Sequence, residues 1–228
     1  PQWSPDSSTL VFTSKAGNLQ HNLAIQSSIT GTEGSRYMIS GAFEQYATSW
    51  TDELLATHAC SNDWGCRISV YRMDDGTPTL VESLEVEGAA VHPTISPDGR
   101  WITYMSNEVG SGVFDVYLRP FPNMQDYRWQ VSTGGGFQPR WHPDSRELFY
   151  AYQTKMMSVA IDDSSDPVGD PVPLFDLDAY TWDLGRNYDL APDGDRFLLV
   201  KPVETDAEIE LVVVTNWFKE LNELVPLP

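Results

Sequence analysis

The chain has 228 residues, of which 41% are hydrophobic, and its 14 basic and 33 acidic side chains give a net charge of −19. That apolar content excludes an intrinsically disordered chain, and the length suits one large all-β domain. The acidic surface repels phosphate backbones, so we expect no nucleic-acid partner. The sequence contains no run of about 20 apolar residues, so it predicts no membrane-spanning helix.

A short motif recurs along the chain: an aromatic or aliphatic residue, then Ser, His or Ala, then Pro and Asp. It reads Trp3-Ser4-Pro5-Asp6, Ile95-Ser96-Pro97-Asp98, Trp141-His142-Pro143-Asp144 and Leu190-Ala191-Pro192-Asp193, with a degenerate copy at Trp50-Thr51-Asp52-Glu53. The copies begin at positions 3, 50, 95, 141 and 190. This spacing is typical of the four-stranded blades of a β-propeller.

Each copy of the motif leads into a run of β-forming residues. These runs cover residues 10–14, 54–60, 101–106, 148–152 and 197–201. Further strands are expected at 22–27, 36–40, 66–72, 115–120, 127–132, 188–191 and 210–214. Pro fixes φ and Asp bonds back to the backbone, so the motif predicts a hairpin turn whose anchors are Asp6, Asp98, Asp144 and Asp193. Aromatic residues of these strands, including Trp3 and Phe149, are expected to pack between blades.

The sequence therefore predicts an all-β fold, a β-propeller of about five four-stranded blades in a single domain over residues 1–228. The expected blades cover residues 1–45, 46–90, 91–137, 138–180 and 181–228. Because the chain begins inside its own motif and the last copy lacks an evident fourth strand, we expect native residues ahead of Pro1. Five blades and a larger ring both fit this pattern. Residues 217–224 predict a short C-terminal helix, capped by Thr215 or Asn216 and ended by Pro226.

The two cysteines, Cys60 and Cys66, lie at the ends of two predicted strands that share a hairpin. Paired strands would bring both thiols to the mouth of this hairpin, where a disulfide is geometrically reasonable. A disulfide would indicate an oxidising compartment, whereas the alternative is two unpaired thiols. Two cysteines with His58 as a lone third ligand make a structural zinc site a poor expectation.

No catalytic constellation is recognisable in the sequence. A Gly-x-Ser-x-Gly elbow and a phosphate-binding glycine loop are absent, and the histidines His21, His58, His92 and His142 fall at different repeat positions. The aspartate-rich run 162–170 could offer oxygen ligands to Ca²⁺, but it lacks the order of an EF-hand and its closing glutamate, so a solvated loop is favoured. We therefore expect no catalytic residue, no metal and no cofactor.

The motif resembles the TolB-type, WD-like propeller repeat, whose pattern is Pro-x-Trp-Ser-Pro-Asp-Gly. Pro1–Asp6 and 139–144 are similar to it, and 93–99 departs from it only at Ile95. A narrower likeness, over 129–132, 146–150, 193–198 and 216–218, is to the C-terminal propeller of bacterial kinase-associated TolB-like proteins. This resemblance implies a periplasmic or otherwise extracytoplasmic interaction module, although the residues contain nothing kinase-like.

The sequence thus favours a non-catalytic interaction or scaffolding module that binds a protein partner, as a subunit of a larger envelope or membrane complex. One alternative is a propeller hydrolase or lyase with its site at the central channel, using carboxylates and groups such as His92 and His142. A second alternative is the sensor domain of a membrane-anchored kinase.

Overall fold

The computed structural model describes residues 1–14, 22–27, 36–39, 43–61, 65–74, 77–110, 112–178 and 186–200. All regular secondary structure in these ranges is β-strand, so the all-β prediction is confirmed. No helix in the described ranges could cross a membrane. The expected C-terminal helix and the expected strand 210–214 lie outside the described residues.

Each of the first four sheets is an antiparallel meander whose four strands follow chain order. The first two sheets contain β1 (Gln2–Trp3), β2 (Thr9–Ser14), β3 (Asn22–Ser27), β4 (Arg36–Ile39), β5 (Glu44–Thr51), β6 (Leu54–Cys60), β7 (Cys66–Asp74) and β8 (Thr77–Leu84). The next two contain β9 (Ala90–Ile95), β10 (Trp101–Ser106), β11 (Asp115–Pro120), β12 (Trp129–Gln130), β13 (Phe137–Trp141), β14 (Glu147–Tyr152), β15 (Lys155–Ala160) and β16 (Val172–Asp176). The described part of the fifth contains β17 (Tyr188–Leu190) and β18 (Phe197–Leu199).

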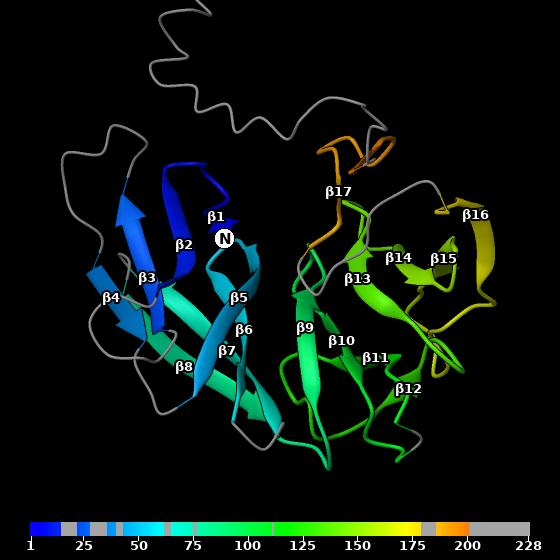
Figure 1. Cartoon of the computed structure of the whole chain (residues 1–228), viewed down its shortest axis with the longest axis horizontal. Helices are drawn as coiled ribbons and strands as arrows, with labels where there is room; N and C mark the ends of the chain where they lie inside the picture. Colours follow the sequence, from blue (N-terminus) through cyan, green and yellow to red (C-terminus); the bar gives the residue numbers. More distant parts are fainter. Residues whose placement is uncertain are drawn as a thin grey trace, which may run out of the picture.

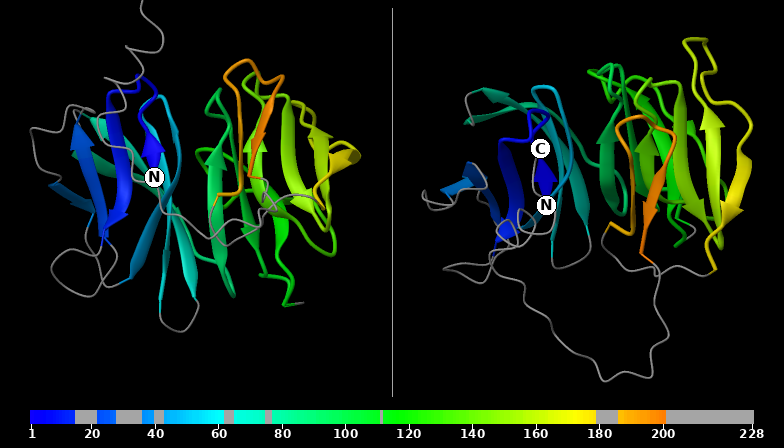
Figure 2. Two further views of the ribbon diagram at one scale, coloured as in Figure 1. Left: turned by 45° about the horizontal axis from the view of Figure 1, so that its top comes forward. Right: turned by 90° about the horizontal axis from the view of Figure 1, so that it is seen from above.

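The five sheets are the blades of a propeller. Figure 1 shows them in chain order around a common centre, with the first strands β1, β5, β9, β13 and β17 innermost. The views in Figure 2 show neighbouring sheets standing side by side. The strands β5, β9 and β13 begin at residues 44, 90 and 137, just ahead of the predicted blade starts. The single-domain organisation over 1–228 stays a prediction, because 201–228 lie outside the described residues.

The core consists of apolar layers between neighbouring blades. Blades 2 and 3 share one cluster, in which Ile68 and Val70 meet Ile102 and Tyr104, and further clusters join blades 1 and 2, 3 and 4, and 4 and 5. Side chains on both faces of a strand are therefore buried, which explains why these strands are apolar without strict alternation.

The expected packing of aromatics between blades is seen for Trp50, Trp101, Phe149 and Phe197, which belong to these clusters. Trp3 differs, because 49% of it is exposed. No apolar cluster of the described residues joins blades 5 and 1, so the described part gives Trp3 no buried layer to enter.

Candidate functional site

The Pro-Asp turns join the first and second strands of blades 1, 3, 4 and 5. In each turn the aspartate accepts a hydrogen bond from the backbone N–H two residues later, at 3.0, 3.1, 2.9 and 3.1 Å for Asp6, Asp98, Asp144 and Asp193. The Ser4 hydroxyl also donates to Asp6, and the hydrogen bonds from Ser4 and Ser8 lower the pKa of Asp6 to about 2. These carboxylates close Asx turns, so their oxygens already have partners within the turn.

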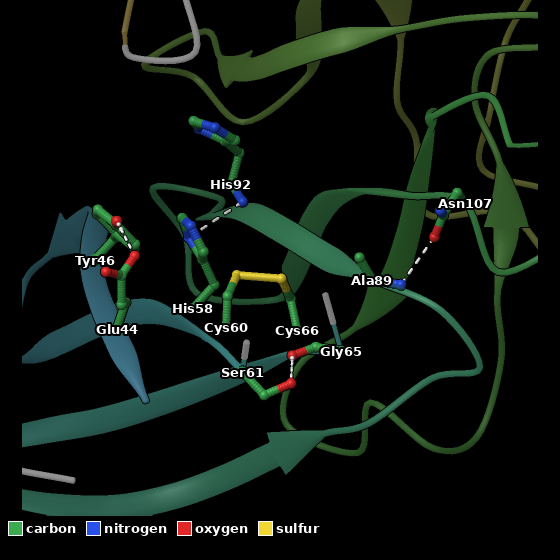
Figure 3. Close-up of a disulfide and its surroundings, with 10 residues drawn as sticks. All are labelled: Glu44, Tyr46, His58, Cys60, Ser61, Gly65, Cys66, Ala89, His92 and Asn107. Atoms are coloured by element: carbon green, nitrogen blue, oxygen red, sulfur yellow. Dashed lines mark hydrogen bonds between the residues drawn. A yellow bond between two sulfur atoms is a disulfide. The ribbon is translucent and has the colours of Figure 1, made fainter. Parts of the chain in front are cut away.

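A disulfide joins Cys60, the last residue of β6, to Cys66, the first residue of β7 (Figure 3). The two cysteines are directly paired in the antiparallel ladder, with their Cα atoms 4.1 Å apart. The Ser61 N–H and hydroxyl both bond to the Gly65 carbonyl oxygen, at 2.9 and 3.0 Å. The hairpin register therefore brings the two sulfur atoms together.

His58 lies two residues before Cys60 in β6 and is buried where blades 2 and 3 meet (Figure 3). Its ring stacks on Tyr46 and lies 5.3 Å from the ring of His92, whose backbone N–H donates to His58 Nδ1 at 3.4 Å. Burial, followed by the charge of His92, lowers the pKa of His58 to about 3. His58 is therefore neutral near pH 7 and acts as a packing group.

The histidines suggested for a channel enzyme have separate surroundings. His92 lies in β9 with φ of 52°, against His58. His142 lies in the turn between β13 and β14, where its Nδ1 is 2.8 Å from Asp144 Oδ1 and its ring meets Phe149 edge-on. No described contact joins His92 to His142, so the structure gives no support to their acting together.

The centre of the ring is occupied by two arginines that come from blades 4 and 5. Arg140 of β13 and Arg186, just before β17, both donate to the backbone carbonyl oxygen of Thr48 in β5, at 3.2 and 3.3 Å. Arg186 also donates to Gln2 Oε1 of blade 1 at 3.0 Å and to Asp189 Oδ2 at 3.0 Å. The two guanidinium groups thus link four blades across the centre.

An irregularity in β5 makes this convergence possible. The register between β5 and β6 shifts between Ala47 and Ser49, so Thr48 has no partner in the regular ladder. A bulged residue leaves its backbone groups out of the ladder, and the Thr48 carbonyl is therefore available to both arginines. The Thr48 hydroxyl donates to the Pro93 carbonyl oxygen at 2.7 Å, which fixes β5 against β9.

Burial lowers the pKa of both arginines. Burial, followed by the charge of Arg186, lowers the pKa of Arg140 to about 10, and burial also lowers the pKa of Arg186, against the opposing effect of Asp189. The buried Nε of Arg140 has no hydrogen-bond partner. Sequence reasoning missed both residues; the only signal was that each lies in or beside a first strand of a chain poor in basic residues.

A separate cavity of about 690 Å³ lies between blades 3 and 4. Its lining combines β12 and the residues around it with β14, β15 and the loop before β16: Arg128, Trp129, Gln130, Val131, Ser132, Thr133, Tyr150, Tyr152, Met157, Asp166, Val168, Gly169 and Pro171. Tyr127, 67% exposed, stacks on Trp129 beside the cavity, and Trp129 meets Trp101 edge-on. The result is an open cavity with an aromatic edge.

Three of the polar side chains that line this cavity are bonded to nearby groups. Arg128 pairs with Glu108 at 3.1 Å, and Gln130 donates to Asp115 at 3.2 Å. The Ser132 hydroxyl accepts from the Val116 N–H at 2.8 Å. The lining therefore presents aromatic faces and paired polar groups.

Two carboxylates of the aspartate-rich run suggested for Ca²⁺ already have hydrogen-bond or ion-pair partners. Asp162 accepts from the Ser164 N–H at 2.8 Å, and Asp163 pairs with Arg100 at 2.6 Å. Within the described residues no group of three or more His, Cys, Asp or Glu side chains is placed to hold a metal ion. The described structure therefore adds no support to the calcium alternative.

No protein-family model and no curated protein matches the chain. Solved structures do match. A TolB-type protein of Agrobacterium tumefaciens is 20% identical, with 76% of this chain and 63% of that chain covered and a TM-score of 0.58. TolB of Acinetobacter baumannii is 14% identical, with 86% and 46% covered and a TM-score of 0.61. The propeller domain of the trilobed protease of Pyrococcus furiosus is 18% identical, with 60% and 45% covered, and its TM-score of 0.45 carries no conclusion.

The chain thus spans less than two thirds of each of these proteins. At such identities the likeness is one of fold, and it agrees with the blade order, the antiparallel meanders and the recurring Pro-Asp turns. Together these observations show that the chain has the β-propeller fold of the TolB type.

Proposed function

We propose that this propeller is a non-catalytic protein-interaction module, that it works outside the cytoplasm as part of a larger envelope assembly, and that a protein partner binds at the cavity between blades 3 and 4. The extracytoplasmic location is supported by the TolB-type fold and by the disulfide, because disulfides persist in oxidising compartments. The kinase-sensor alternative depends on residues ahead of Pro1.

The aromatic edge of the cavity is the observation that carries the proposal. Exposed Tyr and Trp side chains are enriched at protein interfaces because they offer a large apolar area with few rotatable bonds and a polar tip. Tyr127 is mostly exposed and is held in one orientation by its stacking on Trp129. A partner that covers these rings would therefore bury apolar area that is already ordered.

Binding is better supported here than catalysis. Nucleophilic catalysis needs a side chain within hydrogen-bond reach of a general base. The cavity's Ser132 lies 3.4 Å from Asp115 Oδ1, but both residues are buried, and Asp115 already accepts from the Gly135 N–H at 2.8 Å and from Gln130 at 3.2 Å. These bonds suit a structural pair better than a nucleophile and its base. At the centre of the ring two guanidinium groups surround a single carboxylate, Asp189, which is paired with Arg186, and this set of described residues offers no pair of carboxylates for acid–base chemistry.

Site-specific photocrosslinking in the native host tests the proposal. A photoreactive phenylalanine analogue at Tyr127 should give one defined adduct with a second protein, whereas the same analogue at Leu80, an exposed residue of β8 in blade 2, should give none. The change Trp129→Ala should then remove the adduct, because it removes the ring on which Tyr127 rests. The proposal is wrong if position 127 gives no adduct, or only the same adducts as position 80.

A further inference from the structure

Charge at the centre of the ring is unbalanced. Arg140 and Arg186 share one carbonyl oxygen, and Asp189 is the carboxylate that pairs with Arg186. No carboxylate of the described residues lies within ion-pair distance of Arg140. Two guanidinium groups therefore meet one carboxylate, in a chain whose net charge is −19.

This arrangement of charges lowers the stability of the folded protein when nothing else is bound to it. A buried charge needs a counter-ion and a full set of hydrogen bonds, because it has lost its water. Arg140 lacks a direct ion pair and a full set of hydrogen bonds: its Nε is buried without a partner, and repulsion by Arg186 exceeds the more distant attraction of Asp189. A guanidinium group offers five N–H donors in a planar fork, and the bond to Thr48 uses one Nη1 donor of Arg140.

We infer that Arg140 and Arg186 form a binding site for a carboxylate at the centre of the ring. A carboxylate has two coplanar oxygens that match the fork of a guanidinium group, and it would supply the missing negative charge. The Arg186 side chain is 32% exposed, so an incoming group can reach it from solvent, while Arg140 lies deeper.

The carboxylate has two sources in a partner protein, an acidic side chain or a C-terminus. This source rests on the proposed function, whereas binding at the centre does not. The centre and the cavity between blades 3 and 4 share no residue. Loss of one site therefore leaves the other testable.

Calorimetric titration of the full chain with unlabelled peptides tests the inference. One peptide has a single Glu side chain and blocked termini, the second has a free C-terminal carboxylate and no acidic residue, and the third is neutral and blocked. We expect at least one charged peptide to bind more tightly than the neutral one, and the stronger of the two identifies the source. Arg140→Met and Arg186→Gln should each weaken that binding by about tenfold to a hundredfold, the effect of losing one charged hydrogen-bond pair.

Arg196→Gln is the matched control, because Arg196 is an exposed arginine of blade 5 that pairs locally, with Asp193. It should leave the affinity unchanged. The inference is overturned if neither charged peptide binds better than the neutral one, or if Arg140→Met and Arg186→Gln bind as wild type does. Should Arg140→Met fail to fold, the partly exposed Arg186→Gln decides the outcome. A negative result here with an intact crosslink at Tyr127 rejects the carboxylate site and leaves the proposed function standing.

Discussion

One position in the Pro-Asp turns has the same backbone conformation in four blades. Ser7, Gly99, Ser145 and Gly194 have φ of 58°, 70°, 65° and 79°, and each donates its N–H to the carbonyl oxygen three residues earlier. Glycine adopts this left-handed region without steric cost, whereas Cβ makes it unfavourable for other residues. The two serines therefore carry backbone strain that the two glycines avoid.

Replacing Ser7 by glycine should stabilise the protein. We expect Ser7→Gly to raise the free energy of unfolding by about 0.5–1 kcal/mol, measured by urea denaturation. Gly99→Ala is the control of opposite sign: a Cβ at Gly99 would meet no atom within 4 Å, so the backbone conformation alone should cost about 1 kcal/mol. Equal stability of Gly99→Ala and wild type would contradict this account.

Ser145 is a different case, although its backbone is alike. Its hydroxyl accepts a hydrogen bond from the Asp98 N–H at 3.0 Å and so links the turns of blades 3 and 4. Ser145→Gly should therefore raise the free energy of unfolding by less than Ser7→Gly does, because the relief of backbone strain is offset by the loss of the hydrogen bond from the Asp98 N–H. The difference between the two variants measures this link between blades.

His58 gives stability a dependence on pH. Its pKa is about 3 in the folded protein against 6.5 for the free side chain, so below pH 6.5 the unfolded chain binds a proton that the folded one does not. Its contribution to stability is complete above pH 6.5 and is lost as the pH falls towards 3. From pH 7 to pH 5 this loss should reach about 2 kcal/mol.

The variant His58→Gln isolates this effect, because Gln has no charge to gain and can still accept from the His92 N–H. Urea denaturation at pH 7, 6 and 5 should give a stability that falls more steeply for wild type than for His58→Gln. The two titratable groups against His58 are Tyr46 and His92, and both remain in the variant. Parallel pH profiles for the two proteins would rule out His58 as the cause.

At the scale of elements, the strands that follow each turn were predictable, whereas of the strands that precede a turn only the last, β17, was predicted, as 188–191. The predictions 22–27, 54–60, 101–106 and 115–120 match β3, β6, β10 and β11 at both ends. In the innermost strands β9 and β13, a proline directly follows a residue of positive φ, which is His92 in β9 and Gln138 in β13. Both strands have a register shift at this point. Proline is atypical of strands except at edges and bulges, so the local pattern hides them.

The hairpin β6–β7 offers a test of the disulfide. Reduction should lower the free energy of unfolding by about 2 kcal/mol, the chain-entropy expectation for a bond that closes a loop over a sequence separation of 6. Urea denaturation with and without reductant measures this, and mass spectrometry of the unreduced protein establishes the bond. The double variant Cys60→Ser with Cys66→Ser should lose its response to reductant. If the stability of the wild-type protein is also unchanged by reductant, the Cys60–Cys66 bond does not form in solution.

At the scale of the whole molecule, the contacts at the centre of the ring could not be predicted from the sequence. Arg140 and Arg186 are 92 and 138 residues from Thr48, and they meet it only because five blades surround one centre. No local spacing carries that information. The repeat, by contrast, is local and recurs, which is why the propeller could be inferred while its central charges could not.

The overall charge should make this protein more stable in salt. Exposed ion pairs are worth about 0–1 kcal/mol each, and pairs such as Arg67–Glu85 and Arg196–Asp193 lose little when they are screened. Repulsion among an excess of carboxylates that gives a net charge of −19 is screened at the same time, and it acts over the whole surface. We therefore expect the unfolding temperature to rise when NaCl is increased from low to physiological concentration, and we expect Arg140→Met to show the same rise, because screening does not involve the centre. A rise that is absent from Arg140→Met would instead mean that chloride stabilises the protein by binding between the two central arginines.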